Sequence, residues 1–227
     1  MRKNSIESPE GMRESIHIDA SPSVSLPSGV GEDRLEGCRE EMEYFDIVDE
    51  KGNPLGGQVE REIAHRDGIM HRTAHIWVVR RETGEVLLQK RCLAKDSFPG
   101  RYDTSSAGHI QAGDEPLESA LRELEEELGI RAEAEDLHFA DTFRNQYEEP
   151  FHGQMFKDNE VSFVYVYEKP VEIRDLTLQE EEIESVAWFK LDQVIEAVEQ
   201  HDPMFCVPMA GLMIAKRYME NHGKPEE

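Results

Sequence analysis

The sequence has little positive charge, few cysteines and no long apolar run. Its 227 residues carry 25 Lys and Arg against 49 Asp and Glu, which gives a formal net charge of −24. Proteins that bind long nucleic acids meet the phosphates with clustered Lys and Arg, so a nucleic-acid polymer is not expected as a partner. Small phosphorylated molecules stay open as substrates, because a bound cation reverses the local sign of the field.

The scarcity of cysteine and of apolar runs points to a reducing, aqueous compartment. Cys38, Cys92 and Cys206 are far apart and form no CxxC pair, which argues against a disulfide scaffold and against a zinc knuckle. No apolar run approaches the length of a membrane span. The N-terminus lacks an apolar signal core and carries too many acids for an ordinary transit peptide. We therefore expect a cytoplasmic protein that does not bind a membrane.

Residues 1–40 are rich in Ser, Pro, Gly and Glu and poor in large apolar side chains. A segment of this composition cannot bury enough surface to offset the entropy lost on ordering. The sequence thus predicts a disordered acidic tail over 1–40 and one folded domain over 41–222.

The folded part reads as strands, one helix, more strands and then two helices. A strand at 44–48 leads into turns at 49–52 and 54–57, and a polar turn at 82–84 closes a hairpin. This order predicts a mixed sheet with helices packed on it, an α/β (α+β) fold. The other expected strands are 74–79, 86–89, 137–144, 161–167 and 185–190, and the C-terminal helices are 191–200 and 209–220.

Residues 116–128 show a clear helical period. Apolar residues recur at spacings of three and four, Pro116 suits the first turn, and Gly129 lies where a C-cap is expected. Asp114 or Glu115 is available near the N-cap. The apolar stripe of this helix consists of Leu117, Leu121, Leu124 and Leu128.

Three acids share one face of this helix, roughly opposite the apolar stripe. Glu123, Glu126 and Glu127 stand at i, i+3 and i+4. Each pair of like charges destabilises an isolated helix by a few tenths of a kcal/mol, and a divalent cation such as Mg²⁺ would remove that cost. Arg122 can brace a carboxylate. The alternative is a solvated acidic face, which is what charge runs usually form.

The surrounding residues favour the metal site. The segment GHIQAGDEPLESALRELEEELGI closely resembles the Nudix signature, with a Gly, a carboxylate, an Arg-Glu pair, a Glu-Glu pair and a Gly-apolar pair at fixed spacing. Asp114 stands where the signature usually has its first Glu. The matching positions are Gly108, Arg122, Glu123, Leu124, Glu126, Glu127, Gly129 and Ile130.

The resemblance implies an α/β/α sandwich with a mixed sheet, and a Mg²⁺- or Mn²⁺-dependent enzyme. In this family water attacks a phosphorus of a nucleoside diphosphate linked to another group, while the metal neutralises developing charge. Glu123 and Glu127 are implied as the main ligands, Glu126 as a ligand or the base, and Gly108 as a carbonyl ligand. Arg122 falls with the substrate-binding residues.

Residues 44–208 also resemble the branch of the family that includes isopentenyl-diphosphate isomerase. They are more similar still to isomerase-like Nudix hydrolases of plants and bacteria, in EIAHRDGIMHRTAHIWV, LLQKRCLAKDSFPGRYDTSSAGHIQAGD, DNEV and LTLQEEEIESVAWF. The likeness implies diphosphate contacts from Arg91 and Lys95, for which a solvated hairpin exit is the alternative. It also implies a second site suited to Mn²⁺, Zn²⁺ or Mg²⁺. Its ligands would be His65, His71, His109, Asp158 and Glu160, with His75 competing for the place of His71 and ordinary hydrogen-bonded histidines as the alternative.

Position 107 separates the two activities of that branch. Isomerases carry a catalytic cysteine directly before the Gly-His pair, whereas this chain has Ala107, which has no proton to move. The Arg-Glu and Glu-Glu pairs, often degraded in isomerases, are intact. Both observations favour a hydrolase over the alternatives, an isomerase and a module that binds nucleotide without cleaving it.

Three features stay unassigned. Glu181 or Glu182 could serve as the base, although a solvated loop is the more usual role of such a run. Residues 145–157 are taken as a specificity loop. The methionine-rich helix at 209–220 is expected to pack on the sheet or on a second subunit, which leaves a homodimer open.

Overall fold

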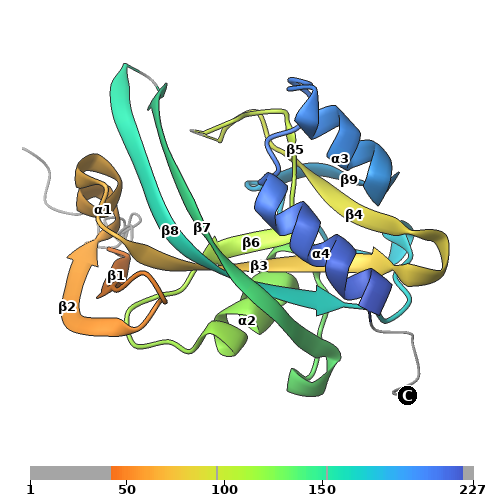
Figure 1. The fold of residues 1–227 in the computed structure, drawn as a ribbon, viewed down its shortest axis with the longest axis horizontal. Coiled ribbons are helices and arrows are strands. Elements are labelled where there is room, and N and C mark those ends of the chain that lie inside the picture. The colour runs from red at the N-terminus through yellow and green to blue at the C-terminus, as the bar shows by residue number, and fades with distance from the viewer. Residues whose placement is uncertain (1–41, 96, 152, 222–227) are drawn as a thin grey trace, which may run out of the picture. The chain divides into compact units, whose positions relative to one another are not determined.

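The computed structural model describes residues 42–95, 97–151 and 153–221 (Figure 1). The predicted tail over 1–40 lies outside these residues, so its disorder and the domain boundary beside it stay predictions. Of the helices in the described part, none has both the length and the hydropathy needed to cross a bilayer.

A mixed sheet of seven strands lies at the centre of the described residues. Its hydrogen-bonded order is β5-β4-β3-β8-β7, with β6 also paired to β3 and β9 to β4. Strands β3 and β8 run parallel, and the other pairs run antiparallel. The strands are β3 (His71–Arg80), β4 (Glu85–Arg91), β5 (Tyr102–Asp103), β6 (Ser106–His109), β7 (Leu137–Phe151), β8 (Gln154–Tyr167) and β9 (Ile183–Lys190).

Helices cover both faces of this sheet, as Figure 1 shows. On β3, Ala74 and Ile76 pack toward α2 (Pro116–Leu128), whereas Trp77 and Val79 pack toward α3 (Leu191–Glu199) and α4 (Met209–Asn221). This alternation follows from the period of two along a strand. The predicted α/β/α sandwich is confirmed.

The helices pack through the predicted apolar stripes. Leu124 and Leu128 of α2 are fully buried on one face of the sheet, and Leu212 and Ala215 of α4 on the other. Of the two packing surfaces predicted for the C-terminal helix, α4 uses the sheet.

The N-terminal part differs from its prediction. Strand β1 (Tyr44–Val48) forms a hairpin with β2 (Pro54–Glu60), so the predicted turn at 54–57 is wrong and these residues begin a strand. A short helix, α1 (Arg61–Asp67), follows and was not predicted. Gly68 ends it with a φ of 70°, the left-handed conformation that glycine adopts at low cost.

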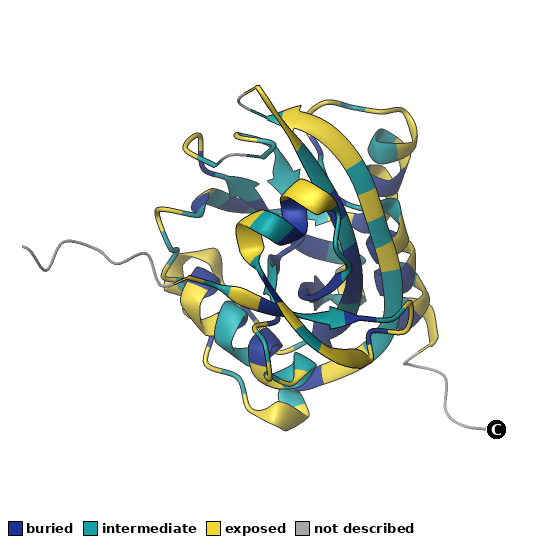
Figure 2. Ribbon diagram, turned by 90° about the vertical axis from the view of Figure 1, so that its left-hand side faces the viewer, coloured by how far each residue is buried: buried dark blue, intermediate teal, exposed yellow. Residues whose placement is uncertain are grey.

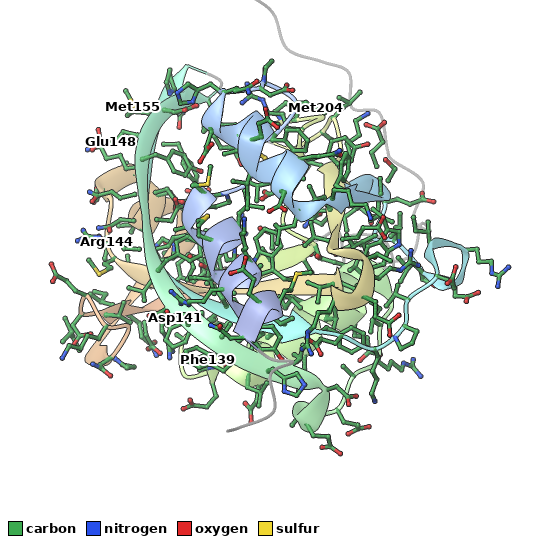
Figure 3. The ribbon with its side chains drawn as sticks, turned by 45° about the vertical axis from the view of Figure 1, so that its right-hand side comes forward. Phe139, Asp141, Arg144, Glu148, Met155 and Met204 are labelled. Carbon is green, nitrogen blue, oxygen red and sulfur yellow. The ribbon has the colours of Figure 1, made fainter. Side chains whose placement is uncertain are left out.

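Residues 145–157 belong to a long hairpin and not to the predicted loop. The β7–β8 ladder runs without a break in pairing from Asn145↔Glu160 to Phe151↔Gln154. Strand β7 is the outer strand of the sheet, and Figure 3 shows the labelled Asp141, Arg144 and Glu148 along it. Exposed and half-exposed residues follow this edge, while the buried segments lie inside the fold (Figure 2). Polar residues on both faces of this hairpin conceal the alternation that marks a strand.

Replacing Gly129 by Ala is expected to lower the free energy of unfolding by more than the cost of holding a non-glycine residue left-handed, which is about 1–3 kcal/mol. Gly129 has a φ of 70°, and an added Cβ would lie 3.1 Å from the backbone N of Thr177. Gly84→Ala is the matched control, since its φ is 65° but its Cβ would meet nothing within 4 Å. Urea denaturation should show the larger loss at Gly129; equal losses would remove the role of the Thr177 contact.

Candidate active site and metal centre

The carboxylates of α2 lie against strand β6. Glu127 is only 5% exposed, and its Oε2 accepts hydrogen bonds from the Ala107 backbone N (3.1 Å) and from Nε2 of Gln89 (3.3 Å). Burial, aided by the nearby charge of Glu123, raises the pKa of Glu127 to about 8. Without a cation this carboxyl therefore holds a proton at neutral pH, and a cation in the proton's place would compensate the buried charge.

Glu123 sits directly over Gly108. A Cβ at position 108 would lie 2.2 Å from the carboxyl carbon of Glu123, so only glycine leaves room for this approach. Arg122 donates to Glu123 Oε1 (3.2 Å), to Asp114 Oδ2 (2.8 Å) and to the carbonyl of His109 (3.2 Å). Burial raises the pKa of Glu123. Asp114 thus holds Arg122 in place and does not cap α2.

The three acids do not all face away from the apolar stripe as predicted. Glu126 is exposed, whereas Glu127 is turned into the interface between α2 and the sheet. The prediction is wrong for Glu127 because α2 packs along β6 and buries a wider part of its surface than the leucines define.

Replacing Gly108 by Ala is expected to lower kcat/KM about 10²-fold, the size of effect that displacing a catalytic group by about 1 Å produces. The new methyl would push away the flexible end of the Glu123 side chain, so the melting temperature should change little. Steady-state kinetics and thermal unfolding on the same sample would check this. Gly113→Ala is the control for an added methyl on the loop before α2. Its φ of 88° makes alanine costly for stability, but a Cβ there meets nothing within 4 Å, so kcat/KM should be unchanged; a matching loss of kcat/KM would contradict the prediction.

The opposite face of β6 carries a second group of polar side chains. Residues paired across antiparallel strands share a face, so Gly108, opposite Ala74, faces α2 while His109, opposite Thr73, faces the other side. There, His65, His71, His109 and Glu160 place ligand atoms within 4.8 Å of one another. These residues come from four elements: α1, β3, β6 and β8.

The imidazoles of this His-rich centre point their Nε2 atoms inward. His109 Nε2 lies 3.3 Å from His65 Nε2 and 3.5 Å from Glu160 Oε1, and His71 Nε2 lies 3.6 Å from Glu160 Oε1. Nδ1 of His65 and of His71 each contact a backbone carbonyl, at 2.9 Å and 2.8 Å. In the tautomer that donates through Nδ1, the lone pair of Nε2 is left for a ligand.

Asp158 completes the predicted set at the edge of the His-rich centre. Its Oδ1 lies 3.9 Å from His65 Nε2, and Asn145 donates to its Oδ2 at 3.0 Å. Among the described residues, Asp158 Oδ1 and His71 Nε2 are buried polar atoms without a hydrogen-bond partner. Such atoms are costly unless a ligand occupies the space between them. His75 contacts Thr104 at 3.5 Å and is not part of the group.

Burial and neighbouring charges shift the pKa values of the His-rich centre in different directions. Burial, together with Glu160, raises the pKa of Asp158 to about 9. Burial alone would also raise the pKa of Glu160, but His71 and His109 hold it below its usual range. Burial and the neighbouring His71 lower the pKa of His65 to about 4. At neutral pH His65 is thus neutral, the form that binds metal ions.

The metal-free protein is expected to lose stability as the pH rises from about 6.5 to about 9. The folded-state pKa values of Glu127 (about 8) and Asp158 (about 9) exceed their ordinary values. Their contribution is complete below the ordinary values and is lost as the pH rises through 8 and 9, by up to about 1.4 kcal/mol per pH unit and group.

His65 acts in the opposite sense, because its lowered pKa contributes stability above about 6.5 that is lost as the pH falls toward 4. Urea denaturation in EDTA and in saturating Mn²⁺ at pH 6.5 and pH 9 would measure these effects. Glu127→Gln should reduce the alkaline loss; an unchanged pH slope in this variant would contradict the assignment.

The two predicted phosphate contacts are paired with protein groups. Arg91 donates to the carbonyl (3.0 Å) and hydroxyl (3.0 Å) of Ser97 and lies 3.3 Å from Asp103. Lys95 pairs with Glu182, whose charge also raises the pKa of Glu127. Lys95 and Glu182 therefore lie near the α2 carboxylates, and neither cation belongs to a solvated hairpin exit.

Of the two acids proposed as bases outside α2, only Glu182 lies near the site. Glu181 is exposed and offers its carbonyl to the thiol of Cys92. The sequence reasoning did not identify Gln89 or Asn145 as partners of site carboxylates. Gln89 stands out as one polar residue after a run of apolar residues in β4, which was a usable signal; Asn145 has none.

Comparison with known proteins places this site in a family. The Nudix domain description matches residues 70–206. The chain is 38% identical to Nudix hydrolase 3 of Arabidopsis thaliana over 165 residues, which is 72% of the chain but only 21% of that relative. It is 38% identical to an uncharacterized Nudix hydrolase of Clostridium acetobutylicum over 68% of the chain and 73% of the relative. A crystal structure of a Deinococcus radiodurans protein matches with a TM-score of 0.60 and 18% identity, over 78% of this chain and 99% of that one.

The chain belongs to the Nudix family of hydrolases. The matched domain includes β6, all of α2 and the His-rich centre except for His65. The Deinococcus structure supports the fold.

Proposed function

We propose that this protein hydrolyses a diphosphate bond in a nucleoside diphosphate linked to another moiety, or in a related small diphosphate, with Mg²⁺ or Mn²⁺. One observation carries the proposal: within a Nudix domain, Glu123 and Glu127 converge on the backbone of β6 at Gly108 and Ala107. Oxygen ligands of this kind suit hard divalent cations.

The residues fit such a cation. Glu127 is buried and holds a proton that a cation would replace, and the bare Cα of Gly108 makes room for Glu123 beside the strand. When bound, the cation supplies charge neutralisation at the phosphoryl oxygens and lowers the pKa of water. Arg122 keeps Glu123 oriented, and Glu126, an exposed residue three positions further along α2, is assigned as the base that takes a proton from the attacking water.

A second cation is proposed at the His-rich centre, in line with the isomerase-like branch. The unpartnered His71 Nε2 and Asp158 Oδ1 support it, as do the two imidazoles whose Nδ1 atoms are fixed by backbone carbonyls. Ala107 lies opposite His75 in the β3–β6 ladder, so its methyl faces the same side of the sheet as this centre. Because the methyl has no acidic proton, hydrolysis is favoured over isomerisation.

A substrate panel tests the proposed function. Nucleotide sugars, dinucleotides, NADH and prenyl diphosphates would be incubated with Mg²⁺ or Mn²⁺, and phosphate release measured after phosphatase coupling. Metal-dependent release from at least one compound, reduced in Glu126→Gln, is expected. Conversion of isopentenyl to dimethylallyl diphosphate, or tight ligand binding by calorimetry without turnover, would instead support the isomerase or the binding module.

A further inference from the structure

Aromatic side chains from two distant segments meet beside His65 of the His-rich centre. Phe98 follows β4, whereas Tyr147, Phe151 and Phe156 belong to β7 and β8. The ring centroid of Phe98 lies 5.7 Å from that of Tyr147 and 5.3 Å from that of Phe151. Phe156 contacts the rings of Tyr147 and Phe151 and stacks on His65 at 4.4 Å. The four rings form one continuous aromatic cover.

The groups beneath this aromatic cover have little contact with solvent. The exposed fraction is 0% for His71, 5% for His65, 5% for Asp158 and 7% for Glu160. Tyr147 lies opposite Asp158 in the β7–β8 ladder, and the charges of Asp158 and Glu160 help burial to raise its pKa. His109 is half-buried, with 17% of its side chain exposed, so a cation or a phosphate reaches the other four groups only by displacing part of the surrounding structure.

Phe98 is the strained member of the aromatic cover. Phe98 has a φ of 50°, a left-handed conformation that bulky residues rarely adopt, so its backbone is strained. Its segment is anchored at the base, where Arg91 N donates to Arg101 O (2.9 Å) and Gly100 N to Arg91 O (3.0 Å). At the tip, among the described residues, ring contacts and no hydrogen bonds join Phe98 to the β7–β8 hairpin, whose end Met155 marks in Figure 3.

The side chain that holds this segment, Arg91, is also the one expected to bind the phosphate of the substrate. Arg91 donates hydrogen bonds from Nε and Nη2 to the carbonyl and hydroxyl of Ser97, the residue directly before Phe98. A phosphate that bound Arg91 would compete for these donors and loosen the segment that holds Phe98. Binding of a diphosphate is thus coupled to the position of the ring, because the anion gains contacts only when Ser97 gives them up.

We propose that Phe98 is a gate residue that controls access to the His-rich centre. Residues 97–99 move away from Tyr147 and Phe151 when a diphosphate takes the guanidinium of Arg91, and the contact re-forms behind it. This inference rests on the proposed function insofar as it takes the His-rich centre to be part of the reaction site.

Chemical modification of histidine tests the gate without relying on turnover. The full chain, metal-free at pH 7, would be treated with diethyl pyrocarbonate, and the rate at each histidine followed by peptide mass spectrometry. In the unmodified sequence, the buried His65 should react much more slowly than the exposed His201. Phe98→Ala should raise the rate at His65 about ten-fold or more and leave His201 unchanged.

Three further variants make the result specific to the ring. Phe98→Gly removes the ring but tolerates the left-handed backbone, so it should behave as Phe98→Ala even if alanine disturbs the fold. Phe98→Tyr should keep the slow rates, as should Leu93→Ala in the same segment, whose side chain is 76% exposed. Unchanged rates in Phe98→Ala and Phe98→Gly would overturn the gate. If no diphosphate is turned over by the unmodified sequence, the proposed function fails, while the modification rates still decide the gate.

Discussion

Glu127→Gln is expected to lower kcat about 10³-fold, which corresponds to about 4 kcal/mol of transition-state stabilisation. The amide keeps the size of the side chain but cannot provide the charge that a cation needs. Because Glu127 holds a proton in the metal-free protein, the amide should preserve the fold. Steady-state kinetics on the best substrate of the panel, with Mg²⁺ varied, would measure both kcat and the metal dependence.

Glu125→Gln is the matched control on the same helix. Its carboxylate pairs with Arg131 on the exposed side of α2, with 53% of the side chain exposed, so kcat should stay within about two-fold. Equal losses of kcat in the two variants would indicate that the total negative charge of the helix, and not the buried carboxylate, determines the activity. A Glu127→Gln enzyme with undiminished kcat would remove the metal site from α2.

Glu160→Gln is expected to weaken binding of one metal equivalent by at least about 10²-fold, beyond what the loss of an outer partner usually costs. Glu160 Oε1 lies within 3.6 Å of the Nε2 atoms of both His71 and His109, so its charge is central to that group. Calorimetric titration with Mn²⁺ should show two sites in the unmodified sequence and one in the variant.

Glu148→Gln provides the comparison, since this residue lies on the outer strand β7 and is exposed (Figure 3). It should retain both sites. A single Mn²⁺ site in the unmodified sequence that survives Glu160→Gln would limit the metal chemistry to α2 and leave the His-rich centre as a hydrogen-bonded cluster.

The α2 site was largely readable from the sequence because its parts are close together in the chain. The helical period, the glycine at 129 and the spacing of the acids all fall between residues 108 and 130. Within such a short segment, helix geometry sets the direction in which each side chain points. Even so, the burial of Glu127 was not predicted, since it depends on how α2 packs against β6.

The His-rich centre could not be derived from local pattern. Its members lie on four elements, two of which, α1 and β6, were not predicted, and they meet only through the pairing of β3 with β6 and β8. The resemblance to the isomerase branch predicted which residues form the centre, and the structure showed that they lie close together. The part of the β7–β8 hairpin between Asn145 and Glu160, which carries three of the four rings of the aromatic cover, was missed because acids and amides outnumber apolar residues there.

The position of strand β6 between the two centres limits the insertions and deletions that the protein can tolerate there. Gly108 faces the carboxylates of α2 and its neighbour His109 faces the imidazoles, with one layer of backbone between them. Inserting or deleting a single residue before this pair would invert both side chains, placing an imidazole against Glu123 and a bare Cα among the histidines. Both centres therefore depend on the same alternation of residues along β6, and a shift of one residue that disrupts one centre also disrupts the other.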